Sequence, residues 1–198
     1  SVYGIKNEEQ VTEDIELVPI SYYNKTKMVA ERVVLSYKDK MSVHCIRPAT
    51  VCGYSPRMRL DVTVNMFVKQ AFKDKKITVF GGKQIRPNIN IKDLINVYIH
   101  FIDNKNLNSG CYNAGFENLS IIEIAKIVSN RIPSEIIISD TKDERSYRQN
   151  SDKLLATGFK RKFNIEEAID DIHNKFATNK INDTDQCYTV KWMKKINL

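Results

Sequence analysis

The residue types best suited to acid–base chemistry lie in the first part of the sequence. Tyr23 and Lys27 are four positions apart, so on a helix their side chains lie on one face, one turn from each other. A tyrosine ordinarily has a pKa of about 10, and a neighbouring ammonium group favours the phenolate and lowers that pKa. Such a pair can act as a general base near neutral pH. A solvated helix face is the alternative interpretation of these two residues taken alone.

Further motifs surround this pair in a fixed order. Tyr23 and Lys27 belong to a Pro-x-Ser-x-Tyr-x-x-Thr-Lys segment, and Val2-Tyr3-Gly4 precedes it. The remaining motifs, in chain order, are Arg47-Pro48-Ala49-Thr50-Val51-Cys52-Gly53, Gly82-Lys83-Gln84-Ile85-Arg86-Pro87, Ile91-Lys92-Asp93, Tyr112-Asn113-Ala114-Gly115, Arg145-Ser146-Tyr147, Ser151-Asp152-Lys153 and Thr157-Gly158-Phe159. In order and spacing they resemble the extended short-chain dehydrogenase/reductase family, in particular its NAD-dependent nucleotide-sugar epimerases and dehydratases. Cys52 and Tyr54 depart from the family's usual Arg-Pro-x-x-Val-Tyr-Gly-Pro.

The resemblance implies how the reactive pair is used. In such enzymes the tyrosine removes a proton from a sugar hydroxyl while hydride passes from the same carbon to NAD, and this role falls to Tyr23. Lys27 is implied to lower the tyrosine pKa and to hydrogen-bond the nicotinamide ribose. Pro48 and Val51 are implied to lie beside the nicotinamide ring, a role compatible with packing at a strand end. NAD is the expected cofactor, with NADP as the alternative.

The resemblance also implies residues that bind the substrate, a nucleotide-diphosphate sugar. The family's asparagine early in a helix and the arginine of its Gly-x-Gln-x-Arg motif correspond to Asn65 and Arg86. Arg145 matches a further phosphate-binding arginine. Two arginines can engage a diphosphate through forked, charge-assisted hydrogen bonds. An exposed surface position is the alternative interpretation for each arginine taken alone.

The residue before Val2-Tyr3-Gly4 bears on the type of reaction. The resemblance implies a glutamate there in the 4,6-dehydratase branch, where it acts as the second acid/base, whereas this sequence has Ser1. Because elimination of water needs such a group, we expect an epimerase, inverting at C4, rather than a dehydratase. The alternatives are a 4,6-dehydratase or a reductase, and a non-catalytic remnant that binds a sugar nucleotide or a partner protein.

Two features usual in the family are not found in the sequence. It contains no Gly-x-Gly-x-x-Gly segment for the pyrophosphate of NAD, and the family's serine or threonine would lie two positions before Ser1. We expect the chain to be the C-terminal part of such an enzyme, inactive by itself. The family dimerises through a four-helix bundle that includes the Tyr-Lys helix, which implies a homodimer for the intact enzyme.

Hydrophobic periodicity and cap signatures predict the elements that position these residues. Two helices are predicted over 23–37 and 62–72, and a third is predicted to begin at an N-cap formed by Asp93. Two more are predicted from capping boxes: one begins after Ser120, with Glu123, and one begins after Asn164, with Glu167, and ends at about Phe176. Strands are predicted over 42–46, where Pro48 stops the strand, and over 77–80, 88–91, 111–114 and 136–138. This alternation predicts an α/β fold with largely parallel pairing.

The family resemblance implies how that fold divides. We expect an incomplete Rossmann-like parallel sheet, formed by residues 1–54 and 86–104, that holds NAD. A smaller α/β domain for the sugar nucleotide is expected over residues 55–85 and 105–180. The residues after Ala177 are predicted to form a loose polar tail, with 181–198 outside both domains.

Composition limits the other classes of function. The 198 residues are 42% hydrophobic and 28% charged, which is typical of a globular chain. Neither an apolar stretch of transmembrane length nor a secretory signal is found, so we expect a cytoplasmic protein without a membrane partner. The four cysteines and three histidines are dispersed, so we expect neither a metal site nor a disulfide framework. The net charge is +7, but the basic residues are interleaved with acidic ones, so no nucleic-acid partner is expected. A basic balance suits a polyanionic ligand such as a sugar nucleotide.

Overall fold

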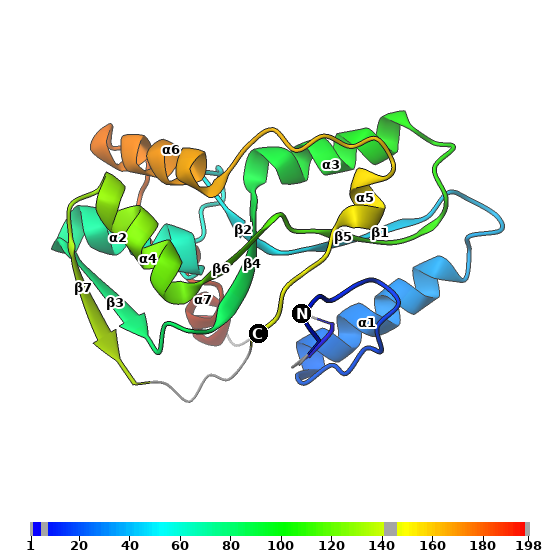
Figure 1. Cartoon of the computed structure of the whole chain (residues 1–198), viewed down its shortest axis with the longest axis horizontal. Coiled ribbons are helices and arrows are strands. Elements are labelled where there is room, and N and C mark those ends of the chain that lie inside the picture. The colour runs from blue at the N-terminus through cyan, green and yellow to red at the C-terminus, as the bar shows by residue number, and fades with distance from the viewer. Residues whose placement is uncertain (1, 5–7, 141–145, 197–198) are drawn as a thin grey trace.

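The computed structural model describes residues 2–4, 8–140 and 146–196. Strands and helices alternate along most of the chain (Figure 1). The elements, in chain order, are α1 (Tyr22–Leu35), β1 (His44–Pro48), β2 (Thr50–Cys52), α2 (Thr63–Asp74), β3 (Lys76–Phe80), β4 (Ile85–Asn90), α3 (Ile91–Asp103), β5 (Gly110–Ala114), β6 (Glu117–Ser120), α4 (Ile121–Arg131), β7 (Glu135–Ser139), α5 (Asp152–Leu155), α6 (Ile165–Ala177), η1 (Asp185–Cys187) and α7 (Thr189–Lys195).

Strand pairing within the described residues is mostly parallel. β1 pairs with β5, β2 with β4 and β3 with β7, all in parallel, and only β4 with β6 is antiparallel. This confirms the α/β class and the largely parallel pairing that the sequence predicts. The short strands β2 and β6 were not predicted, because three or four residues give too little periodicity to detect.

Two larger apolar cores lie at opposite ends of the described part of the molecule, and a third, smaller one contains Val2, Tyr3 and Val11. At one end α2, α4 and α6 gather beside β3 and β7, and at the other α3 and α5 lie near β1 and β5 (Figure 1). In α2 the buried residues Val64, Phe67, Val68 and Ala71 recur at helical spacing, so one face of the helix enters the first core. No helix in the described part of the chain has the length and apolar character needed to cross a bilayer.

Two predicted helix starts are confirmed by their caps. At α4 the Ser120 side chain accepts a hydrogen bond from the Glu123 backbone N–H, and the Glu123 carboxylate accepts one from the Ser120 N–H in return. Asn164 and Glu167 form the same reciprocal arrangement at α6. Each capping box satisfies backbone donors that a helix start leaves without partners.

The prediction that Asp93 caps the third helix is wrong. The cap of α3 is Asn90, whose Oδ1 accepts from Lys92 N at 3.0 Å. Asp93 lies inside the first turn and is fully buried, and its carboxylate accepts from the backbone N–H groups of Lys162 and Phe163. Its role is to fix the connection that leads into α6, a contact between distant segments that local sequence does not show.

The predicted stop of the first strand at Pro48 is also wrong, since β1 includes this residue. Ala49 N donates to Ala114 O at 2.8 Å, so pairing with β5 continues past the proline. Among the described strands β1 has only β5 as a neighbour, so Pro48 lies on an edge strand, where a residue without an N–H is tolerated.

The C-terminal segment is not the loose polar tail that was predicted. It forms η1 and α7, and Cys187 is buried in the first core with Ile181 and Tyr188 packed against it. Leu60 N donates to Cys187 O at 2.9 Å, which ties the segment to the loop before α2. Few apolar residues mark this segment; Ile181, Cys187 and Tyr188 pack in or against the core, whereas Val190 and Met193 are exposed. The division of the chain into two domains stays a prediction.

Asp183 holds this segment against α2. Its carboxylate accepts hydrogen bonds from Lys73 Nζ at 2.8 Å and Tyr188 Oη at 2.7 Å, and it pairs with Lys69 Nζ at 2.9 Å. Burial alone would raise the pKa of Asp183, but these partners lower it from 3.8 to about 2. Because the pKa is lower in the folded state, the stabilisation is present above pH 3.8 and is lost as the pH falls through about 2.

We therefore expect Asp183→Asn to lower the free energy of unfolding by about 1–2 kcal/mol near neutral pH, and by less as the pH falls below 3.8. Urea denaturation followed by Trp192 fluorescence measures this difference at each pH. Asp103→Asn, a change at the exposed end of α3, is the control and should have little effect at any pH. A difference between Asp183→Asn and the parent that is unchanged at low pH would contradict the assignment.

Candidate active site

A cavity of about 880 Å³ lies between α1, the strands β1, β2 and β4, and the loop before α2. Its volume is that of a pocket for a small molecule or cofactor. Of the described residues that the sequence singles out, Asn65 does not line it. Arg145 lies outside the described residues. The other five line the cavity: Tyr23, Lys27, Pro48, Val51 and Arg86.

The reactive pair lies on the first two turns of α1. Ser21 caps this helix, with its Oγ accepting from Asn24 N at 3.2 Å, so the helix begins one residue before Tyr23. Lys27 Nζ lies 5.2 Å from the centroid of the Tyr23 ring, as expected for side chains four residues apart. Tyr23 is 63% exposed, which leaves its hydroxyl accessible to a ligand in the cavity.

A third residue on the same face of α1, Glu31, anchors the helix to β1. It follows Lys27 by four residues and also lines the cavity. Both of its carboxylate oxygens accept from the Arg47 guanidinium, one of them from Nε at 2.9 Å. The two side chains are only 11% and 9% exposed. This forked, nearly buried pair fixes the rotation of α1 and with it the direction of Tyr23 and Lys27.

The network continues from Arg47 to Tyr3, Asn113 and Gln149. Arg47 Nη1 donates to Tyr3 Oη at 2.8 Å, and Tyr3 Oη donates to Asn113 Oδ1 at 2.6 Å. Gln149 Nε2 donates to both Arg47 O, at 2.7 Å, and Asn113 Oδ1, at 3.0 Å. Residues far apart in the sequence therefore meet beside the cavity, which Tyr3, Arg47 and Gln149 line.

The electrostatics of this network bear on Tyr3, which lines the cavity together with Tyr23 and Tyr147. Burial raises the pKa of Tyr3 to about 12, against the hydrogen bond and charge of Arg47. Burial alone would raise the pKa of Glu31, but Arg47 outweighs it and holds that pKa below its ordinary 4.5. Burial alone would lower the pKa of Arg47, but its bonds to Glu31 and Tyr3 raise it overall. Tyr3 is thus neutral near pH 7 and a poor base, and the candidate base is Tyr23, because Lys27 lies beside it.

Sequence reasoning did not single out Glu31 or Arg47 as functional residues. Two signals were available: Glu31 continues the spacing of Tyr23 and Lys27 by one more turn, and Arg47 is a charged residue within a strand. A charge that is nearly buried needs a partner of opposite sign, so a search for such pairs would have joined the two.

Pro48 and Val51 form an apolar part of the cavity wall next to this ion pair. Pro48 ends β1 and is exposed, while Val51 is half-buried in the middle of β2. Val51 pairs in register with the buried Ile89 of β4, which fixes the wall against the second core. The side chains are thus open to the cavity on one side and supported on the other.

Asn65 uses its amide to hold two loops. Its Oδ1 accepts from Gly53 N at 3.1 Å, and its Nδ2 donates to Arg59 O at 2.9 Å. The residue is 3% exposed in the first turn of α2. Any effect of Asn65 on a ligand in the cavity would therefore act through the loop that carries Arg59.

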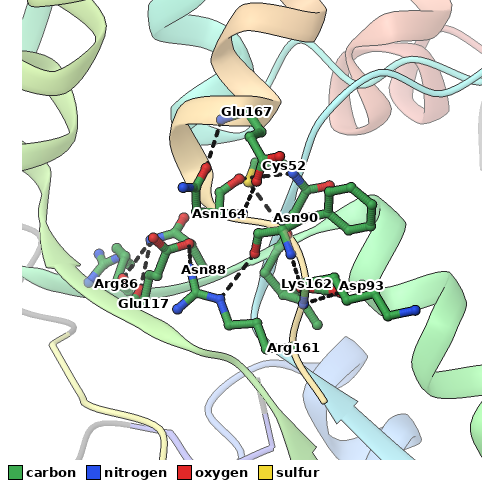
Figure 2. A network of polar contacts seen from close by, with 12 residues as sticks. Cys52, Arg86, Asn88, Asn90, Asp93, Glu117, Arg161, Lys162, Asn164 and Glu167 are labelled. Carbon is green, nitrogen blue, oxygen red and sulfur yellow. Dashed lines mark hydrogen bonds and ion pairs between the residues drawn. The ribbon is translucent and has the colours of Figure 1, made fainter. Parts of the chain in front are cut away.

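Arg86 enters the cavity wall from β4, at the edge of a polar network that joins β4 to β6, α3 and α6 (Figure 2). Asn88 Nδ2 donates to Arg86 O at 2.8 Å and to Glu117 O at 3.3 Å. The Glu117 carboxylate pairs with Arg161 at 2.7 Å, and burial raises the pKa of Glu117 although Arg161 opposes it. This network fixes the backbone of β4, so Arg86 projects from a rigid element.

Residues 2–4, 8–140 and 146–196 contain no group of three or more His, Cys, Asp or Glu side chains that could hold a metal ion, and the four cysteines are free. The cavity instead offers a tyrosine hydroxyl, an ammonium, an apolar wall and a guanidinium. This set suits proton transfer next to an anionic ligand.

Comparison with known proteins gives consistent matches. A model of the NAD dependent epimerase/dehydratase family matches residues 1–115. The uncharacterized UDP-glucose epimerase YtcB of Bacillus subtilis (strain 168) is 28% identical over 132 residues, covering 66% of this chain and 42% of that protein. The UDP-glucose 4-epimerase of Lactobacillus helveticus is 26% identical over 204 residues, which cover 81% of this chain and 61% of that protein. The chain thus spans roughly half the length of these curated relatives.

Solved structures share the fold. RMD from Pseudomonas aeruginosa, complexed with NADPH, matches with a TM-score of 0.79 at 19% identity, and the match covers 90% of this chain and 64% of the RMD chain. The UDP-glucuronic acid 4-epimerase from Bacillus cereus, in complex with UDP-glucuronic acid and NAD, has a TM-score of 0.76 at 23% identity, with coverage of 90% and 59%. These similarities confirm the Rossmann-like α/β class expected from the sequence.

Proposed function

The chain belongs to the NAD-dependent epimerase/dehydratase family, and from this premise we propose that it carries the substrate side of a nucleotide-sugar 4-epimerase. The observation that supports the proposal most is the convergence of Tyr23, Lys27 and Arg86 on one cavity. A base, a cation beside it and a second cation for an anionic group are the groups that oxidation of a sugar hydroxyl in a nucleotide sugar requires.

We propose that the cavity holds the nicotinamide end of NAD, with NADP as the alternative. The residues present fit this group: Lys27 supplies hydrogen-bond donors for a ribose hydroxyl, and Pro48 and Val51 supply an apolar wall for the ring. When bound, the cofactor accepts and returns a hydride. The sequence has no Gly-x-Gly-x-x-Gly segment, so no residue of this chain is assigned to the cofactor pyrophosphate.

In the proposed reaction Tyr23 Oη accepts the proton of the sugar hydroxyl at the carbon that is oxidised. For this step Tyr23 must carry its negative charge on Oη before the transfer, and the ammonium of Lys27, which lies over the tyrosine ring, stabilises that phenolate; accepting the proton makes the tyrosine neutral. The same tyrosine returns the proton when the hydroxyl is re-formed with inverted configuration. Tyr3 is the poorer base, since burial raises its pKa to about 12.

We propose a nucleotide-diphosphate sugar as the substrate, and UDP-glucose as the first compound to test. Arg86 would bind the diphosphate through charge-assisted hydrogen bonds, and the two curated relatives are named for UDP-glucose. Asn65 would act through the Gly53 and Arg59 loops that it holds. The role of Arg145 stays a prediction from the family motif. Ser1, where the dehydratase branch has glutamate, favours epimerisation over elimination.

We further propose a homodimer that packs through α1. None of the described α1 residues is buried, and Val29, Val33 and Val34 are exposed at 52%, 55% and 42%. A helix with an exposed apolar stripe is stabilised when a second copy covers that stripe.

The direct test of the proposed function is conversion of UDP-glucose by the complete protein in the presence of NAD. The expected product is UDP-galactose, detected by proton NMR, without net formation of NADH. A keto-deoxy sugar would assign the chain to the dehydratases, and net oxidation of NADPH would assign it to the reductases. Failure of every nucleotide sugar to react would contradict the catalytic proposal.

A further inference from the structure

We propose that Arg59 is a second anion-binding residue of the cavity and that the C-terminal segment 179–195 positions it. This inference rests on the proposed function, because the anion would be part of the nucleotide sugar. Arg59 lies in the loop between β2 and α2 and lines the cavity together with Arg86. Two guanidinium groups on one cavity can hold an anionic group from two directions.

The packing of the loop directs Arg59 into the cavity. Its neighbours on either side, Met58 and Leu60, are buried in the first core at 6% and 1% exposure. The Arg59 side chain is 46% exposed. Its Nε donates to Asp61 Oδ1 at 2.9 Å, whereas neither Nη group has a partner among the described residues. The Nη groups are therefore available for a ligand, and the bond at Nε restricts the orientation of the guanidinium.

The C-terminal segment holds this arrangement from behind. The Asp61 carboxylate bridges Arg59 and α7, since its second oxygen accepts from Thr189 N at 2.9 Å. The backbone on either side of Arg59 is also fixed, with Arg59 O accepting from Asn65 and Leu60 N donating to Cys187 O. The position of Arg59 thus depends on residues more than a hundred positions later in the chain.

The ligand chemistry that fits Arg59 is an oxyanion. A nucleotide sugar offers two sources: the diphosphate, and a carboxylate where the sugar is a uronic acid. The test uses UDP, UDP-glucose and UDP-glucuronic acid as probes, and measures binding to the 198-residue chain by isothermal titration calorimetry.

We expect Arg59→Met to raise the Kd by about tenfold or more, because a hydrogen bond to a charged group is lost. Lys38→Met is the control, since Lys38 is exposed and does not line the cavity; we expect less than about a twofold change. A loss for all three probes assigns Arg59 to the diphosphate, and a loss confined to UDP-glucuronic acid assigns it to the sugar carboxylate. Asp61→Asn removes the charge that holds Nε and should weaken binding by a smaller factor.

The failures are distinguishable. If the parent chain binds the probes and Arg59→Met binds them equally well, Arg59 is not a ligand-binding residue and the proposed function stands. If Arg59→Met weakens binding but Asp61→Asn does not, the positioning role of the C-terminal segment is wrong. If the parent chain binds none of the probes, the proposed function fails together with this inference.

Discussion

The Tyr23→Phe variant of the complete protein is expected to convert UDP-glucose about 10²–10⁴-fold more slowly than the parent, the range over which a positioned general base contributes. The change removes only the hydroxyl, so the ring and its contact with Lys27 are kept. Because Tyr23 is 63% exposed, the stability of the fold should not change. The initial rate of UDP-galactose formation and the thermal midpoint of unfolding measure the two effects separately.

The neighbouring residue supplies a matched control. Tyr22 is 86% exposed on the same helix, and Lys25 Nζ lies 5.7 Å from its ring centroid, but Tyr22 does not line the cavity. Tyr22→Phe should therefore convert UDP-glucose within about twofold of the parent rate. Equal rates for Tyr22→Phe and Tyr23→Phe would show that Tyr23 is not the base.

The Arg47→Met variant is expected to lower the free energy of unfolding by about 3–5 kcal/mol, the usual effect of removing one partner from a buried ion pair. It leaves the Glu31 carboxylate without its cation and the Tyr3 hydroxyl without one of its two partners. Water cannot replace the lost cation well, because the side chains of Arg47 and Glu31 are only 9% and 11% exposed. Urea denaturation of the chain measures the loss.

Two further variants separate the buried pair from a general effect of charge. Arg32→Met removes an exposed cation from the same helix and should cost less than about 0.5 kcal/mol. Combining Glu31→Gln with Arg47→Met should restore part of the stability that Arg47→Met loses, since no charge is then left buried. If Arg47→Met costs no more than Arg32→Met, the pair does not anchor α1.

Much of the fold could be predicted because its signals are local. The buried stripe of α2 follows helical spacing, and the two capping boxes lie within four residues each. The β-branched and aromatic runs of β3 and β7 marked both strands to within a residue at either end. The choice of Tyr23, Lys27 and Arg86 came from the resemblance to the family; all three line one cavity, and their roles stay predictions.

The missed features depend on contacts between distant segments. Asp93 is used by the backbone of Lys162 and Phe163, about seventy residues later, rather than by its own helix start. The pairing of Glu31 with Arg47 crosses from helix to strand. The C-terminal segment folds through a few apolar and charged residues whose partners lie on α2 and the loop before it. No periodicity in the local sequence encodes such contacts.

The most direct test of the central claim, that a nucleotide sugar binds against Tyr23, is an NMR titration of the 198-residue chain labelled with ¹³C at its tyrosine rings. The Tyr22→Phe and Tyr23→Phe variants assign the two neighbouring ring signals. On addition of UDP-glucose the Tyr23 signal is expected to shift and to saturate, while the Tyr22 signal stays in place. A Tyr23 signal that does not move at saturating UDP-glucose would contradict the account.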